Sequence, residues 1–176
     1  MSAVAELISR WVRPVPDWPE PGVTFRDITP LIADAGALAA VVDALVDQAA
    51  ARGPVDAVIG VEARGFIFAP AVALRLGVGF VPVRKLGKLP AERLGVAYDL
   101  EYGSATVEMH ADALRPGARV IVIDDVLATG GTMAAVGELV ALAGATVAAN
   151  LVLLELSALG GRERLGPIGC IALHTY

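Results

Sequence analysis

The chain contains little of the chemistry that marks secreted, metal-rich or nucleic-acid-binding proteins. Its 176 residues include a single cysteine, Cys170, which cannot form an intramolecular disulfide or a multi-cysteine metal site. Nothing therefore indicates an oxidising compartment, and a cytoplasmic location is expected. Positive charge is also scarce, since the formal net charge is −5. A nucleic-acid partner is not expected, because such binding depends on a basic surface.

Long hydrophobic runs are absent as well. The most apolar window, residues 139–154, is interrupted by Gly144 and is shorter than the ~20 residues that a spanning helix needs. Near the N-terminus, Glu6 and Arg10 interrupt the apolar residues, unlike the continuous core of a secretory signal. We therefore expect neither a membrane partner nor a secretory signal.

The remaining composition suits one folded domain, which we expect to span residues 1–176, because 56% of the residues are hydrophobic and 19% are charged. Short runs rich in valine and isoleucine alternate with helix-length segments that end in glycine. The predicted strands are 55–60, 79–83, 119–124, 146–156 and 168–173, and the predicted helices are 38–53, 65–77 and 132–144. This alternation predicts an α/β fold with an open, mainly parallel sheet flanked by helices. A polar segment at about 84–103, flanked by proline and glycine, is expected to form a flexible cover loop.

The segment VIVIDDVLATGGT, residues 120–132, carries the most specific signal. Asp124 and Asp125 follow an apolar strand, where a parallel sheet binds its ligands. The glycines after Thr129 allow a tight turn, so that backbone N–H groups at the start of the next helix can surround a phosphate; Thr132 can also cap that helix. Two ionised carboxylates accept hydrogen bonds from adjacent hydroxyls. A ribose 5-phosphate carries both a phosphate and two adjacent hydroxyls.

Other kinds of binding site fit this pattern less well. A metal site would require more carboxylates or histidines nearby. The P-loop pattern fails, because the frame from Gly60 to Gly65 continues into Phe66 and not into lysine, and no dinucleotide-binding Gly-x-Gly-x-x-Gly occurs.

The Asp-Asp-x-x-Ala-Thr-Gly-Gly-Thr run closely resembles the phosphoribosyl pyrophosphate (PRPP) motif of the type I phosphoribosyltransferases. Further blocks are similar to the subfamily that uses adenine, in the same order over nearly the whole chain. They are PDWPEPGVTFRDITPL (16–31), GVEARGFIFAPAVA (60–73), VPVRKLGKLP (81–90), YDLEYG (98–103) and LGGRERL (159–165). The resemblance implies a small hood formed by about 13–33 over one catalytic domain.

The resemblance also implies which residues bind PRPP. Asp124 and Asp125 would bind the ribose. The 5′-phosphate would be bound by Ala128, Thr129, Gly130, Gly131 and Thr132, and pyrophosphate by Arg64, Arg84, Lys85 and Lys88. The residues alone leave other interpretations open, namely a surface pair between Arg64 and Glu62 and an ordinary solvated turn at 84–88.

For the base, the resemblance implies that Glu101 is the catalytic carboxylate that receives the purine proton, and that Phe25, Arg26 and Leu127 bind adenine. Without it, Glu101 is one more solvated acid, Phe25 is a core aromatic, and Arg26 forms a local ion pair with Asp27.

The implied reaction converts adenine and PRPP into AMP and pyrophosphate in purine salvage. Mg²⁺ is the implied cofactor, bound mainly through PRPP and not directly by the protein, and a homodimer is the implied assembly. Two alternatives stay open: transfer to guanine, hypoxanthine or xanthine, and a non-catalytic PRPP-sensing regulator. The regulator would be expected to carry a basic face, which the net charge disfavours.

Overall fold

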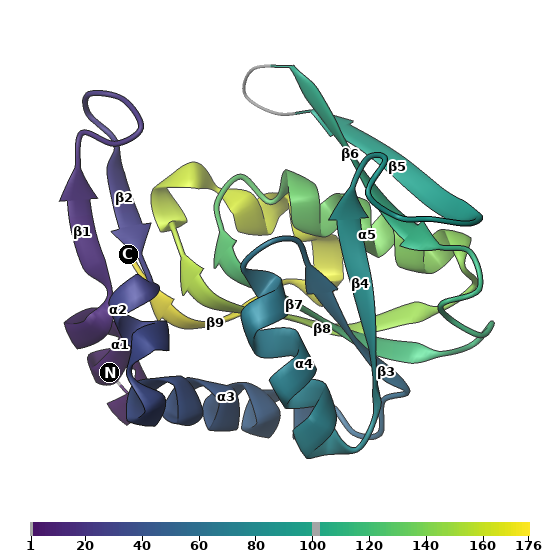
Figure 1. The fold of residues 1–176 in the computed structure, drawn as a ribbon, viewed down its shortest axis with the longest axis horizontal. Coiled ribbons are helices and arrows are strands. Elements are labelled where there is room, and N and C mark those ends of the chain that lie inside the picture. Colours follow the sequence, from purple (N-terminus) through teal and green to yellow (C-terminus); the bar gives the residue numbers. More distant parts are fainter. Residues whose placement is uncertain (1, 100–102) are drawn as a thin grey trace.

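A seven-stranded sheet in the order β5–β6–β4–β3–β7–β8–β9 forms the centre of the molecule (Figure 1). The structure, a computed structural model, describes residues 2–99 and 103–176. The neighbours in the series β4–β3–β7–β8–β9 pair in parallel, whereas β6 pairs antiparallel with both β5 and β4 at one edge. The strands are β3 (Ala57–Val61), β4 (Gly79–Lys85), β5 (Arg93–Asp99), β6 (Ser104–His110), β7 (Arg119–Leu127), β8 (Thr146–Glu155) and β9 (Ile171–Thr175). The predicted open, mainly parallel sheet is confirmed.

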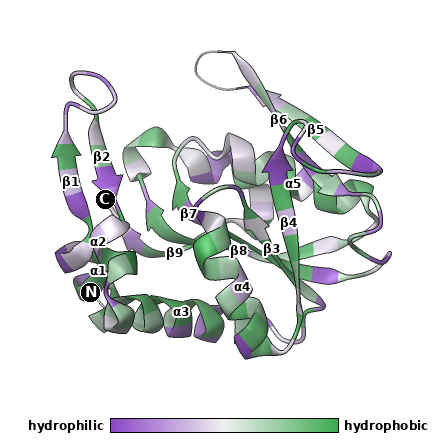
Figure 2. Cartoon of the chain, in the orientation of Figure 1, coloured by the Kyte–Doolittle hydropathy of each residue, from purple (hydrophilic) through white to green (hydrophobic). Residues whose placement is uncertain are grey.

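Helices cover both faces of this sheet, which explains why its central strands are apolar almost throughout. Ile59 and Val122 pack toward α5, whereas their neighbours Val58 and Ile121 pack toward α1, α3 and α4. Most of the hydrophobic colour accordingly lies on the helices and central strands (Figure 2). The helices are α1 (Ala3–Trp11), α2 (Thr29–Ala33), α3 (Ala35–Ala50), α4 (Gly65–Leu76) and α5 (Gly131–Leu142), with 3-10 segments η1 (Ser157–Leu159) and η2 (Gly161–Ile168).

Several boundaries differ from those predicted. Strand β7 does not end at Asp124 but runs on to Leu127, because Leu127 still pairs with Glu155 of β8. The aspartates therefore lie inside the strand. Strand β9 begins later than predicted, since residues up to Ile168 belong to η2. Helix α3 begins earlier because Asp34 caps it, accepting a hydrogen bond from the backbone N–H of Ala37 at 2.8 Å.

Two hairpins were not predicted. In the 13–33 segment, β1 (Arg13–Pro16) and β2 (Thr24–Asp27) form a separate two-stranded sheet (Figure 1). In the 84–103 segment, which the sequence predicts as a flexible loop, β4 continues to Lys85 and β5 forms an antiparallel pair with β6. Only Val96 is buried in β5. Such strands escape detection because little of their surface enters the core.

Candidate active site

A cleft of about 800 Å³ opens where the carboxyl ends of β3, β4 and β7 meet. The loop after β3, the end of β4, the end of β7 and the start of α5 line it. From the predicted site, the cleft is lined by Arg64, Arg84, Lys85, Asp124, Asp125, Leu127, Ala128, Thr129, Gly130, Gly131 and Thr132. Segments far apart in the sequence thus form one cavity large enough for a nucleotide-sized ligand.

The two aspartates of the cleft have raised pKa values. Asp124 Oδ1 accepts a hydrogen bond from the backbone N–H of Asp125 at 2.8 Å. Burial raises the pKa of both carboxyls; the charge of Asp125 raises the pKa of Asp124 further, whereas Arg64 opposes the rise for each. Arg64 Nη1 lies 2.9 Å from Asp125 Oδ2. This contact is ionic without hydrogen-bond alignment, so that buried oxygen has no hydrogen-bond donor. A ligand hydroxyl can supply one.

The loop after β7 turns into α5 through a left-handed residue. Gly130 has φ +80° and occupies the N-cap position of α5, a conformation that glycine adopts without steric cost. Thr132 is therefore not the cap, contrary to the possibility raised from the sequence; its hydroxyl donates to the Tyr98 hydroxyl at 3.1 Å. The first backbone N–H groups of α5 have no acceptor within the helix and can bind an anion.

Glu62 organises the positive residues on the opposite side of the cleft. Its carboxylate accepts hydrogen bonds from Lys88 Nζ at 2.8 Å, from the Lys85 backbone N–H at 3.0 Å and from Arg84 Nε at 3.3 Å. Burial alone would raise the pKa of Glu62, but these donors outweigh it and lower the pKa to about 2. The alternative pairing of Glu62 with Arg64 is wrong, because Arg64 pairs with Asp125. The turn at 84–88 is thus anchored to Glu62, which lines the cleft.

Phe25, in strand β2, lies close to Arg64 of the cleft. Phe25 is half-buried, and the guanidinium carbon of Arg64 lies 5.3 Å from the centre of its ring. The Phe25 ring also packs edge-on against Trp18, with ring centres 4.4 Å apart. Arg26 stacks on the ring of Tyr176 at 3.8 Å. Phe25 and Arg26 are thus not among the residues that line the cleft, and Arg64 is the cleft residue whose guanidinium faces the Phe25 ring.

The alternative of a local Arg26–Asp27 ion pair is wrong. Asp27 pairs with Arg13 across the β1–β2 hairpin. Hydrogen bonds from Thr29, followed by those from Arg13, lower the pKa of Asp27 to about 2.

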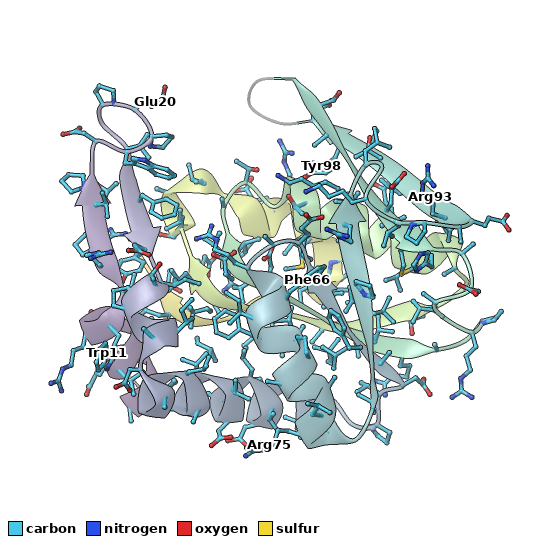
Figure 3. The ribbon with its side chains drawn as sticks, in the orientation of Figure 1. Trp11, Glu20, Phe66, Arg75, Arg93 and Tyr98 are labelled. Carbon is cyan, nitrogen blue, oxygen red and sulfur yellow. The ribbon has the colours of Figure 1, made fainter. Side chains whose placement is uncertain are left out.

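The β5–β6 hairpin borders the cleft on its remaining side. Tyr98 projects from β5 toward the N-terminus of α5 (Figure 3), and Tyr98 and Ser104 both line the cavity. Glu101, the predicted catalytic residue, lies outside the described residues. The hairpin brings the chain on either side of Glu101 to the cleft.

Sequence reasoning missed the role of Glu62 as the acceptor for this turn, and it missed the hydrogen bond between Tyr98 and Thr132. Glu62 is 26 residues from Lys88 and Tyr98 is 34 from Thr132. No local spacing links such pairs. The one available signal was Glu62 itself, an acidic residue in GVEARGF directly after β3. Strand β3 pairs with β4, which leads into the RKLGK turn.

The side chains of the cleft determine whether it can hold a metal ion. Within residues 2–99 and 103–176, no group of three or more His, Cys, Asp and Glu side chains is arranged to hold a metal ion. The carboxylates of Asp124 and Asp125 nevertheless supply the oxygen donors that Mg²⁺ prefers, and one buried Asp125 oxygen lacks a hydrogen bond. Two carboxylates do not form an all-protein metal site, but they fit a magnesium ion that is bound mainly through a phosphate compound. In the same part of the chain, no helix has the length and apolarity to cross a membrane.

The fold and the cleft define a phosphoribosyltransferase, and the chain belongs to that family: the model of the phosphoribosyl transferase domain matches residues 30–170. The sequence is 58% identical to adenine phosphoribosyltransferase from Thermobifida fusca, over 98% of this chain and 97% of that one. Within the family, the chain belongs to the adenine phosphoribosyltransferases.

Solved structures agree with this assignment. Adenine phosphoribosyltransferase from Thermoanaerobacter pseudethanolicus superimposes with a TM-score of 0.92 at 45% identity, covering 98% of this chain and 99% of that chain. The Saccharomyces cerevisiae enzyme, complexed with an imino-altritol bisphosphate and adenine, superimposes with a TM-score of 0.93 at 38% identity, again covering 98% and 99%.

Proposed function

We propose that the protein transfers the 5-phosphoribosyl group of PRPP to adenine, producing AMP and pyrophosphate for purine salvage. The observation that carries this function is the juxtaposition of the Asp124–Asp125 pair with the anion-binding turn at 128–132 in one cleft. The Saccharomyces cerevisiae relative, complexed with adenine and a bisphosphate, supports the choice of base.

PRPP is held at both ends of its ribose. Asp124 and Asp125 accept hydrogen bonds from the two ring hydroxyls, and Asp125 Oδ2, which has no hydrogen-bond donor although it lies against Arg64, provides a buried acceptor. The backbone N–H groups from Ala128 to Thr132, together with both threonine hydroxyls, bind the 5′-phosphate. Fixing both groups orients C1′ for attack and lowers the entropic part of the barrier.

The pyrophosphate end is bound by cations. Arg64, Arg84, Lys85 and Lys88 neutralise the charge that develops as the bond from C1′ to pyrophosphate breaks and the electron pair leaves with oxygen. Mg²⁺ bound mainly through PRPP, with Asp124 and Asp125 as the nearby carboxylates, would supply further neutralisation. Arg64 exchanges its ionic contact with Asp125 for the phosphate, because its guanidinium is more than one-third exposed and free to turn.

Adenine binds between the hood and the cleft. Phe25 stacks on the purine, Leu127 packs against it, and the backbone around Arg26 recognises the exocyclic amine. The ring nitrogen forms its new bond to C1′, and Glu101 accepts the proton that this nitrogen loses. Residues 13–33 act as the hood and residues 84–103 as the cover of a single domain. We place the protein in the cytoplasm as a homodimer, because its one cysteine is unpaired and closed two-fold dimers are the commonest assemblies.

The test is turnover with a panel of purines. Protein, PRPP and Mg²⁺ are incubated with adenine, guanine, hypoxanthine or xanthine, and nucleotide and pyrophosphate are measured. AMP and pyrophosphate should form in equal amounts with adenine. Turnover restricted to the 6-oxopurines would transfer the function to another base, and PRPP binding without any turnover would identify a PRPP-sensing regulator.

The proton-accepting role of Glu101 has its own test. Glu101→Gln should lower kcat by about 10²-fold or more, the usual contribution of a positioned base, while the Kd for PRPP stays within about twofold. Asp99→Asn is the matched control, because it removes an acid that lies two residues from Glu101 in the sequence. Equal losses in the two variants would show that general charge, and not a positioned base, is responsible.

A further inference from the structure

The LGGRERL block has no part in the mechanism above, yet its backbone touches the phosphate turn. A methyl group on Gly161 would lie 2.2 Å from the carbonyl oxygen of Ala128 and 3.0 Å from the backbone nitrogen of Gly130. Conversely, a methyl group on Gly130 would lie 2.3 Å from the carbonyl oxygen of Gly161. The two stretches of main chain are therefore in direct contact, and no side chain fits between them.

The residue after Gly161 anchors this contact to the sheet. Arg162 donates from Nε to Glu155 Oε1 at 2.5 Å and from Nη2 to Glu155 Oε2 at 2.6 Å. Its remaining nitrogen, Nη1, donates to the Cys170 carbonyl at 2.5 Å. Glu155 is 5% exposed, so the carboxylate is a fixed point for this fork. Bidentate arginine–carboxylate pairs of this kind restrict geometry as well as adding energy.

The same carboxylate-bearing strand also holds the base of the phosphate turn. Leu127, the last residue of β7, pairs with Glu155, and the Leu127 carbonyl accepts a hydrogen bond from Leu156 N–H at 2.9 Å. One side of the turn is thus fixed by β8 directly. The other side contacts Gly161, and Gly161 is held in place because the next residue, Arg162, binds Glu155 at the same end of β8.

We infer that Gly161 is a positioning residue, which the Arg162–Glu155 pair anchors. Its main chain contacts the 128–132 turn and sets the spacing of the phosphate-binding N–H groups of that turn. This inference rests on the proposed function and extends it to a segment that does not touch substrate. The left-handed Gly130, with φ +80°, is the part of the turn that the contact constrains. Arginine at 162 is required because lysine cannot reproduce the three-point fork.

Gly161→Ala tests the contact directly. The methyl group must displace the turn, so we expect the KM and the calorimetric Kd for PRPP to rise about tenfold or more, while the KM for adenine stays within about twofold. Gly137→Ala in α5 is the matched control, because no atom lies within 4 Å of the added methyl; its constants should match wild type. An unchanged Kd for PRPP in Gly161→Ala would overturn the inference.

Arg162 variants provide the test if Gly161→Ala fails to fold. Arg162→Ala should weaken PRPP binding, and Arg162→Lys should recover only part of it. Arg115→Ala is the control, since Arg115 pairs with Asp56 at the opposite end of the sheet. If Arg162 only stabilised the fold, Arg162→Ala and Arg115→Ala would both lower Tm without a selective change in the Kd for PRPP. That result would also overturn the inference.

Failure of the proposed function gives a different pattern. If the wild-type protein uses a 6-oxopurine in place of adenine, the choice of base is wrong. The calorimetric Kd for PRPP still compares Gly161→Ala with Gly137→Ala in that case, because the measurement requires no turnover.

Discussion

Replacing Asp124 with asparagine is expected to stabilise the free protein and to weaken its binding of PRPP. The asparagine Oδ1 can still accept the 2.8 Å hydrogen bond from the Asp125 N–H, and the ionic contact of Arg64 with Asp125 remains. The change removes one of two adjacent acids whose pKa values are raised by burial. A gain of about 1 kcal/mol in the free energy of unfolding is typical of relieving such a site. For a domain of this length it corresponds to a rise in Tm of about 2–4 °C.

The sign of the pH dependence follows from the raised pKa of Asp124. Below about pH 3.9, the pKa of an unfolded aspartate, the carboxyl is protonated in both states and costs nothing. As the pH rises, the unfolded chain ionises first, so the wild-type protein loses stability until the pH passes the folded pKa. The Tm advantage of Asp124→Asn should therefore be larger at neutral pH than near pH 4, close to the unfolded pKa of about 3.9.

Binding should change in the opposite direction. Loss of one charge-assisted contact to a ribose hydroxyl costs about 1.5–3 kcal/mol, which is roughly 10- to 100-fold in the Kd for PRPP. Differential scanning calorimetry at the two pH values and titration calorimetry with PRPP measure both effects. A variant that is less stable than wild type, or whose Tm difference does not depend on pH, would show that the buried charge of Asp124 does not destabilise the free protein.

Further predictions concern residues around the cleft. Glu62→Gln should lower the inhibition constant of pyrophosphate about threefold, because Arg84 and Lys88 lose a competing carboxylate; weaker inhibition would contradict this. With a pKa of about 2 for Glu62, the effect should be constant across neutral pH. Gly65→Ala should cost about 1–3 kcal/mol in unfolding free energy, since the methyl group would lie 2.7 Å from the Ile123 carbonyl oxygen; wild-type denaturant stability would show that α4 moves away freely.

The sequence predicts the parts of the fold that are buried on both faces. Strands β3, β7 and β8 contain long apolar runs, because neighbours such as Val58 and Ile59 pack against helices on opposite sides. The edge hairpin escapes prediction, since β5 buries one residue. The β1 strand contains two prolines, which lack the N–H that strand pairing uses.

The candidate site shows the same division. Asp124, Asp125 and the turn that follows are adjacent in sequence, so their clustering is predictable from one motif. Contacts between distant segments are not, and the structure is needed to pair Glu62 with Lys88 and Gly161 with Ala128. These pairs depend on strand order in the sheet, which local periodicity does not specify.

The central claim is that this cleft transfers phosphoribose to adenine, and a direct competition tests it. Equal concentrations of adenine, hypoxanthine and guanine are mixed with limiting PRPP and Mg²⁺, and the nucleotides are separated and quantified. AMP should be the dominant product, and Asp124→Asn should suppress its formation. A mixture dominated by IMP or GMP, or one with no nucleotide despite PRPP binding, would contradict it.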